Sequence, residues 1–155
     1  MNFDVQKVET NTLPAGRYVI SDPCYIFDEK YWDDLLRLTD YLDDVVFSVN
    51  GHLCFSHTTA YGDGSYFFEK KSLNVSIIDD KSVDGLGVDS GVLAIIPISL
   101  IEEMNFELDI DYLIVEYKSD FKVSYDDGIY NLGGIIIDSK SIEDDEDWDE
   151  DWDDD

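Results

Sequence analysis

Three aspartates of this 155-residue chain stand in turns, where a carboxylate could do chemistry. Asp22 precedes a proline, Asp63 lies between two glycines, and Asp89 is the centre of a Gly-Val-Asp-Ser-Gly turn. If the three turns converge, their carboxylates could hold a divalent cation or act as acid and base on a small molecule. Aspartate is also common in turns because it accepts hydrogen bonds from the turn's own backbone amides. We favour that role and keep a pocket of the three aspartates as the alternative.

The two histidines offer a second chemistry. A Ser–His–Asp arrangement can be drawn from Ser90, His57 and Asp63, but such triples can be drawn in most sequences. The Gly-x-Ser-x-Gly turn that exposes a nucleophilic serine is missing. His52 and His57 are five residues apart in one expected strand, so they point to opposite faces and cannot readily share a metal ion. We therefore expect no enzymatic reaction, no metal and no cofactor, with His57 part of the alternative pocket.

The charge of the chain limits its partners more sharply. It has 37 acidic and 10 basic residues, a net charge of −27. The tail Glu143–Asp155 holds 11 acids and no base, and the remaining 26 acids and 10 bases leave −16 on the body. Such a charge repels nucleic acids and anionic membranes and favours basic partners or cations. Acidic pairs in the body, which could be spaced like phosphates, are Asp79-Asp80, Asp109 with Asp111, and Asp126-Asp127.

The acidic tail contains an internal duplication. Glu146-Asp147-Trp148-Asp149 is followed at once by Glu150-Asp151-Trp152-Asp153. A block of this charge is expected to be disordered when free. A coat that only solvates has no need of indoles, whereas tryptophan is enriched where binding energy concentrates. We therefore predict that a basic partner is bound by Asp144, Asp145, Asp147, Trp148, Asp149, Asp151, Trp152 and Asp153, together with Asp126 and Asp127 of the body.

The run Val92–Pro97 is the centre of the expected fold. It is an unbroken apolar run ended by proline, which indicates a strand buried on both faces. Asn50-Gly51 between two strand-like runs predicts a hairpin, and the turn Asp126-Asp127-Gly128 predicts a second one. Nine or ten short strands are expected in all, including Arg17–Ser21 and Leu73–Ile77.

Two helices are predicted, one from Glu29 to about Asp43 and a short one over Ile98–Met104 that begins after Pro97. The predicted class is α+β, mostly β, with a twisted antiparallel sheet or partly closed barrel and one or two short helices. We expect a globular domain over residues 1–141 and a disordered acidic tail over 142–155. An exposed sheet edge could pair with a second copy as a homodimer, although like charge opposes close approach.

Cys24 and Cys54 match no metal-binding or redox spacing, so buried free thiols in a reducing cytoplasm are expected. The N-terminal residues lack the basic start and apolar run of a signal peptide. No stretch approaches the ~20 apolar residues needed to cross a bilayer. A cytoplasmic protein is therefore predicted.

Asp22-Pro23-Cys24-Tyr25, Tyr61-Gly62-Asp63-Gly64 and Val88-Asp89-Ser90-Gly91 together resemble a group of small uncharacterised bacteriophage proteins, which are related to a bacterial domain of unknown function. The resemblance covers roughly Gly16 to Pro97. It implies a β-rich fold and a phage origin, and therefore a host-cell cytoplasm as the location. It supplies no reaction and no catalytic residues.

These observations lead to one functional hypothesis and one alternative. The first is an acidic phage-type protein that inhibits a host nuclease, restriction or other defence factor, or transcription factor by DNA mimicry. Carboxylates on alternate strand residues, ~6.6 Å apart, would be spaced on the scale of backbone phosphates. The alternative is a small-molecule or metal-binding protein, a sponge or hydrolase of a defence signal, that uses Asp22, Asp63, Asp89 and His57.

Overall fold

The computed structural model describes residues 4–27, 31, 45–60, 64–82, 85–88, 91–108 and 111–139. Within these ranges the strands form three sheets in which all described pairings are antiparallel. The largest sheet has seven strands, in the spatial order β1 (Val5–Val8), β4 (Val45–Val49), β5 (His52–Thr58), β10 (Val92–Pro97), β3 (Gly16–Ser21), β11 (Leu113–Tyr117) and β8 (Val75–Asp80).

A second sheet has five strands, and two further strands form a small ribbon. The five-stranded sheet has the order β2 (Thr12–Leu13), β12 (Phe121–Asp126), β13 (Ile129–Leu132), β14 (Ile135–Asp138) and β7 (Phe68–Lys70). The ribbon pairs β6 (Gly64–Tyr66) with β9 (Leu86–Val88). The described helices are the 3₁₀ turn η1 (Pro23–Tyr25) and α2 (Ile98–Met104).

The central strand β10 is buried along its whole length. Its alternate side chains enter two different cores, as the period of two along a strand requires. Leu93 and Ile95 join the core shared with the five-stranded sheet, which includes Val123, Tyr130, Leu132, Ile135 and Ile137. Val92, Ala94 and Ile96 join the core shared with α2 and η1, which includes Ile26, Phe27, Leu100, Ile101 and Met104.

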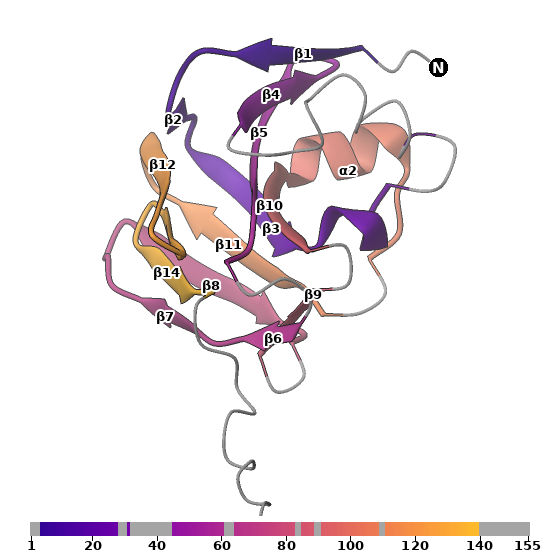
Figure 1. Cartoon of the computed structure of the whole chain (residues 1–155). Helices are drawn as coiled ribbons and strands as arrows, with labels where there is room; N and C mark the ends of the chain where they lie inside the picture. Colours follow the sequence, from indigo (N-terminus) through magenta and orange to yellow (C-terminus); the bar gives the residue numbers. More distant parts are fainter. Residues whose placement is uncertain are drawn as a thin grey trace, which may run out of the picture.

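The molecule is therefore layered, with the seven-stranded sheet in the middle. The five-stranded sheet covers one of its faces and α2 covers the other (Figure 1). This arrangement explains why β10 shows no alternation of apolar and polar residues, because neither of its faces meets water. The predicted class, mostly β with antiparallel sheets and a short helix, is confirmed.

Both predicted hairpins are present. Val49 pairs with His52 across Asn50 and Gly51, whose φ angles of 52° and 86° are those of a type I′ turn. Asp126 pairs with Ile129 across Asp127 and Gly128, whose φ angles are 50° and 84°. The second loop is thus two residues long, and Asp126 belongs to its strand. The short helix also has its predicted bounds, with Pro97 as its N-cap.

The strand expected over Leu73–Ile77 is displaced along the chain. The structure has β8 at Val75–Asp80, and Leu73 is 86% exposed. The Ser72 hydroxyl accepts a hydrogen bond from the Asn74 amide at 3.0 Å, which makes a turn where the strand was expected to begin. Leu73, the first residue of the predicted strand, therefore belongs to a turn, and the strand begins at Val75.

The outer strand β8 carries a bulge. Val115 pairs with Ile77 and Ile114 pairs with Asp79, so Ile78 has no partner position on β11. Bulges and charged side chains are the usual means by which an edge strand avoids pairing with another chain. Because Asp79, Asp80 and Lys81 follow the bulge, this edge opposes the pairing of a second copy through β8.

Two predictions lie outside the described residues. The helix over 29–43 falls there except for Tyr31, whose ring packs edge-on against Phe106 with centroids 5.9 Å apart. The acidic tail over 142–155 falls there entirely. Within the described part of the chain, no helix has the length and apolar character required to cross a membrane.

Substitution of two glycines separates the cost of backbone strain from the cost of a steric clash in the core. A Cβ at Gly51 would meet no atom within 4 Å, so Gly51→Ala should cost only the strain of a left-handed residue, about 1 kcal/mol. A Cβ at Gly133 would lie 2.6 Å from both Phe121 Cδ2 and Tyr117 Cε1. Gly133→Ala should therefore be the more destabilising by urea unfolding, since it must also separate the stacked Tyr117 and Phe121 rings. Equal losses of stability in the two variants would contradict this packing.

Candidate functional site

The alternative pocket of turn aspartates is only partly described. Asp63 and Asp89 lie outside the described residues. Asp22 is fully buried, between the end of β3 and η1, and its carbonyl accepts a hydrogen bond from the Tyr25 amide at 3.1 Å. Among the described side chains, no group of three potential ligands is placed to hold a metal ion. Asp22 is thus a buried turn residue in the part of the chain that can be seen.

His57 and Asp22 lie on opposite sides of β10. Ala94 pairs with Ser21 on one side and with Ser56 on the other, and Asp22 and His57 are the next residues of those two strands. Their backbones are therefore about two strand spacings, or ~10 Å, apart. The His57 ring stacks on Tyr125 with centroids 3.5 Å apart, and Nδ1 lies 2.7 Å from the Thr58 carbonyl. The His57 ring thus packs against the five-stranded sheet.

The acidic pairs of the body are found on different strands. Asp79 and Asp80 end β8, where Asp79 lies 3.9 Å from the Lys81 ammonium and Asp80 accepts hydrogen bonds from Ser82. Asp126 and Asp127 lie exposed at the tip of the second hairpin. Asp109, predicted to pair with Asp111, is outside the described residues. The described pairs thus form separate small patches.

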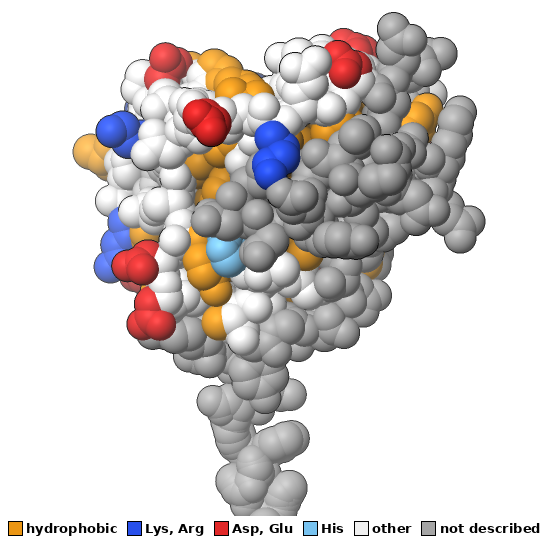
Figure 2. All heavy atoms as spheres, turned by 45° about the horizontal axis from the view of Figure 1, so that its top comes forward, with side chains coloured by type: hydrophobic (Ala, Val, Ile, Leu, Met, Phe, Trp, Pro, Cys, Tyr) orange, Lys and Arg blue, Asp and Glu red, His pale blue; other side chains and the backbone are white. Residues whose placement is uncertain are grey.

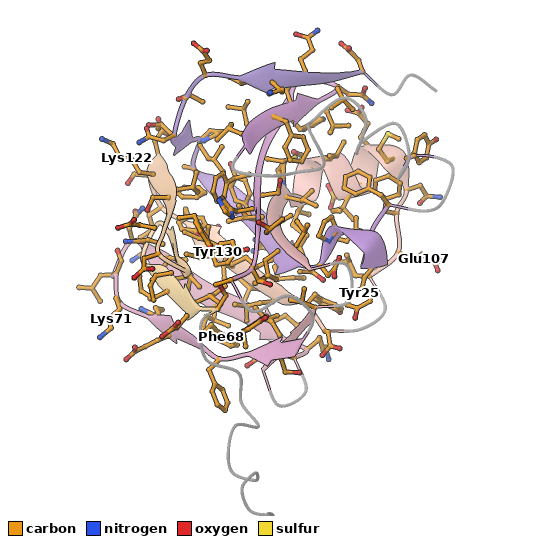
Figure 3. The ribbon with its side chains drawn as sticks, viewed as in Figure 1. Tyr25, Phe68, Lys71, Glu107, Lys122 and Tyr130 are labelled. Atoms are coloured by element: carbon orange, nitrogen blue, oxygen red, sulfur yellow. The ribbon has the colours of Figure 1, made fainter. Side chains whose placement is uncertain are left out.

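The described residues carry charges of both signs. They include 15 acids and 7 bases, a net charge of −8, so 22 of the 37 acids lie elsewhere in the chain. Several of the 15 lie close to a cation, as Glu116 does at 3.7 Å from Arg17 and Glu69 at 3.5 Å from Lys71. Acidic and basic side chains both occur among the coloured atoms of the face in Figure 2. Figure 3 shows Lys71 and Lys122 at the periphery, whereas Tyr130 lies in the interior.

The most organised polar cluster joins the first hairpin to α2. His52 follows the Asn50-Gly51 turn, and its Nδ1 lies 2.8 Å from the Ser99 hydroxyl. Its other ring nitrogen, Nε2, lies 2.8 Å from Oε1 of Glu103. Ser99 and Glu103 are four residues apart on α2, so one face of the helix presents both to the same imidazole.

Asn50 holds the far end of this cluster. Its Nδ2 donates to Oε2 of Glu103 at 3.2 Å, and its Oδ1 accepts from the Asp4 amide at 2.8 Å. Hydrogen bonds from His52 and then Asn50 hold the pKa of the Glu103 carboxyl below its usual range. Glu103 is therefore ionised near neutral pH, although its side chain is 45% exposed.

The ionisation of Glu103 sets the direction of the chain of hydrogen bonds. A carboxylate can only accept, so Nε2 of a neutral His52 must carry the proton. Nδ1 is then an acceptor, and the Ser99 hydroxyl donates to it. Serine, histidine and carboxylate thus stand in the order of a catalytic triad, with the two ring nitrogens exchanged, since Nδ1 faces the serine and Nε2 faces the carboxylate.

Ser99 and His52 open onto a surface groove. The groove encloses about 520 Å³, and its walls come from the β2–β3 turn, the first hairpin and the start of α2. It is lined by Pro14, Ala15, Gly16, Arg17, Tyr18, Gly51, His52, Leu53, Pro97, Ile98, Ser99 and Glu102. Apart from His52, the charged side chains among these lining residues are Arg17 and Glu102.

No protein-family model, curated protein or solved structure matches the chain.

A second groove, of about 590 Å³, lies between β1 and β12. Tyr125, the ring on which His57 stacks, lines it together with Phe55 and Lys7.

In the core, Cys54 is a free thiol, and complete burial raises its pKa. A thiol in that state is a poor nucleophile, as expected for a structural cysteine.

The serine, histidine and acid that meet are Ser99, His52 and Glu103, whereas the triple drawn from the sequence was Ser90, His57 and Asp63. A signal was present, since Ser99 and Glu103 have the i, i+4 spacing of one helix face. The partner histidine is 47 residues before Ser99 in the sequence, and only the packing of α2 against the hairpin brings it within hydrogen-bond distance.

Acidification should reveal the contribution of Glu103 to stability. Because its pKa is lowered on folding, the stabilisation is present above the pKa of the unfolded state and is lost as the pH falls through the folded-state pKa. When the pH is lowered from about 6 to 3, the free energy of unfolding measured by urea titration should fall less in Glu103→Gln than in the wild type. The matched control is Glu102→Gln, one residue earlier on α2, which should follow the wild type. Parallel curves for all three proteins would refute the assignment.

Proposed function

We propose that this chain is an acidic inhibitor that binds a basic nucleic-acid-binding or defence protein and offers carboxylates in place of DNA phosphates. The observation that carries the proposal is the distribution of charge. The chain has a net charge of −27, from 37 acids and 10 bases. Of these acids, 11 lie in the 13 residues of Glu143–Asp155, which contain no base.

The charge density of the tail supports this role. An extended chain advances ~3.3 Å per residue, so 11 acids in the 13 residues of Glu143–Asp155 place a charge roughly every 4 Å. One strand of B-DNA carries a phosphate about every 3.4 Å along the helix axis. A groove lined with lysine and arginine for DNA would therefore meet a comparable density of negative charge along the tail.

Trp148 and Trp152 distinguish the tail from a purely electrostatic ligand. The two indoles stand four residues apart at the same position of each Glu-Asp-Trp-Asp unit. Indoles placed between carboxylates add apolar contact area that salt does not screen. The partner surface would therefore combine basic side chains with apolar pockets. A basic protein without such pockets would bind the tail through charge alone.

The folded body would contribute fewer acidic contacts than the tail. Asp126 ends β12 and Asp127 begins the turn that follows, and both side chains are exposed, so they could add to the acidic surface. The mixture of charges on the rest of the described surface favours the tail as the principal ligand. The resemblance to small bacteriophage proteins favours the cytoplasm of a bacterial host as the setting.

The proposal is tested by capture and competition. The immobilised full-length chain should retain a basic protein from a bacterial lysate at about 50 mM salt, and duplex DNA should displace that protein. Binding should weaken steeply with salt, since each ion contact replaces released counterions. Retention of no basic protein at low salt, or retention that DNA does not affect, would refute the proposal.

Variants of the tail separate charge from aromatic contact. Replacing all the acids of Glu143–Asp155 by Asn and Gln should abolish binding and its salt dependence. Trp148→Ala with Trp152→Ala should weaken binding but preserve the salt slope. Asp79→Asn with Asp80→Asn is the control for charge on the body, and its affinity should stay within about twofold of the wild type. A loss of affinity in this control equal to that of the neutralised tail would place the interface on the body instead.

A further inference from the structure

The cluster of Ser99, His52 and Glu103 has features that a structural clamp does not require. A serine and a histidine suffice to tie α2 to the hairpin, and no carboxylate is needed on the far ring nitrogen. Glu103 occupies that position at 2.8 Å and is itself oriented by Asn50 at 3.2 Å. The result is a histidine of fixed tautomer whose free lone pair points at a serine hydroxyl.

The serine at the end of this chain is accessible. Ser99 is exposed, in the first turn of α2, whereas His52 is largely covered, with 21% of its side chain exposed. Both residues line the groove of about 520 Å³. A nucleophile at a groove surface, backed by a more protected base, is the arrangement that lets a substrate approach the hydroxyl while the base keeps its geometry.

We propose that Ser99 is a catalytic nucleophile, with His52 as its general base and Glu103 as the residue that positions His52, and that the groove binds a small neutral carboxylic ester. This activity is independent of the acidic inhibitor function, since none of the three residues lies in the tail.

The reaction has two balanced halves. The Ser99 Oγ attacks the ester carbonyl carbon while its proton passes to Nδ1 of His52. The C–O bond to the alcohol then breaks, and His52 returns that proton to the departing alkoxide, which leaves an acyl-serine. Water attacks the acyl carbon with His52 again taking a proton, the bond to Ser99 breaks, and Oγ recovers its proton as the carboxylic acid leaves. No electrons are transferred and no further reactant is needed.

The composition of the groove selects the class of substrate. Its walls include Pro14, Ala15, Leu53, Pro97 and Ile98, which suit an apolar acyl group. The net charge of −27 and the carboxylate of Glu102 at the groove disfavour an anionic ester. Arg17, whose Nε lies 3.7 Å from Glu116, also lines the groove, and a cation that reached the substrate would stabilise the negative charge that develops on the carbonyl oxygen.

A fluorophosphonate probe tests the nucleophile directly, because an activated serine displaces fluoride from phosphorus and retains the label. Mass spectrometry of the labelled full-length chain should place the label on Ser99. Ser99→Ala should lose that label, and His52→Gln should slow labelling about 100-fold, since the base is lost. Hydrolysis of p-nitrophenyl acetate should fall in the same order. Ser124→Ala, an exposed serine of β12 outside this groove, is the matched control and should label like the wild type.

Two results would overturn the proposal. One is a label absent from Ser99 in the wild type. The other is labelling of Ser99 at the same rate in His52→Gln, or in wild-type protein unfolded in urea, because ordinary hydroxyl reactivity needs no folded cluster. A purely structural role for Ser99 would change the unfolding midpoint of Ser99→Ala but produce no label. The charge-neutralised tail variant should label normally, which keeps this proposal separate from the inhibitor function.

Discussion

The structure depends on the burial of β10 on both faces. A strand in this position can satisfy its backbone groups only through its two neighbours, and β5 and β3 pair with it on either side. Its side chains then require one apolar layer above the sheet and another below. The five-stranded sheet supplies the first and α2 with η1 supplies the second. Burying one Val, Leu or Ile side chain stabilises the folded state by roughly 1.5–3 kcal/mol. Because the side chains of β10 alternate between the two cores, the strand stabilises both of them.

This central burial also explains how so acidic a chain can fold. The core residues of both layers are apolar or aromatic, and the one fully buried carboxylate among the described residues is Asp22. Charge repulsion acts mainly between exposed groups, where water and salt screen it. The described acids are moreover diluted by lysine and arginine, while the densest run of negative charge is at the end of the sequence.

The first hairpin connects the fold to the candidate site. Asn50 adopts the left-handed backbone that a type I′ turn requires, and its side chain reaches Glu103 of α2. His52, the first residue after the turn, is consequently held between two residues of that helix. The turn that joins β4 to β5 therefore also sets the distance between this hairpin and α2. That distance determines the geometry of the polar cluster.

The sequence by itself determined the local elements with strong signals. Asn50-Gly51 specifies a two-residue turn, and Asp126-Asp127-Gly128 specifies a second hairpin, although the structure places Asp126 in the strand. The apolar run Val92–Pro97 specifies a doubly buried strand. It also determined the charge and its concentration in the tail. The start of β8 was misplaced, because the turn at Ser72 and Asn74 depends on a side-chain hydrogen bond that periodicity does not reveal. Only the tertiary structure decided which serine, histidine and acid meet. Hydrogen bonds act over about 3 Å, and the packing of α2 on the sheet brings His52 and Ser99, 47 positions apart in the sequence, to that distance.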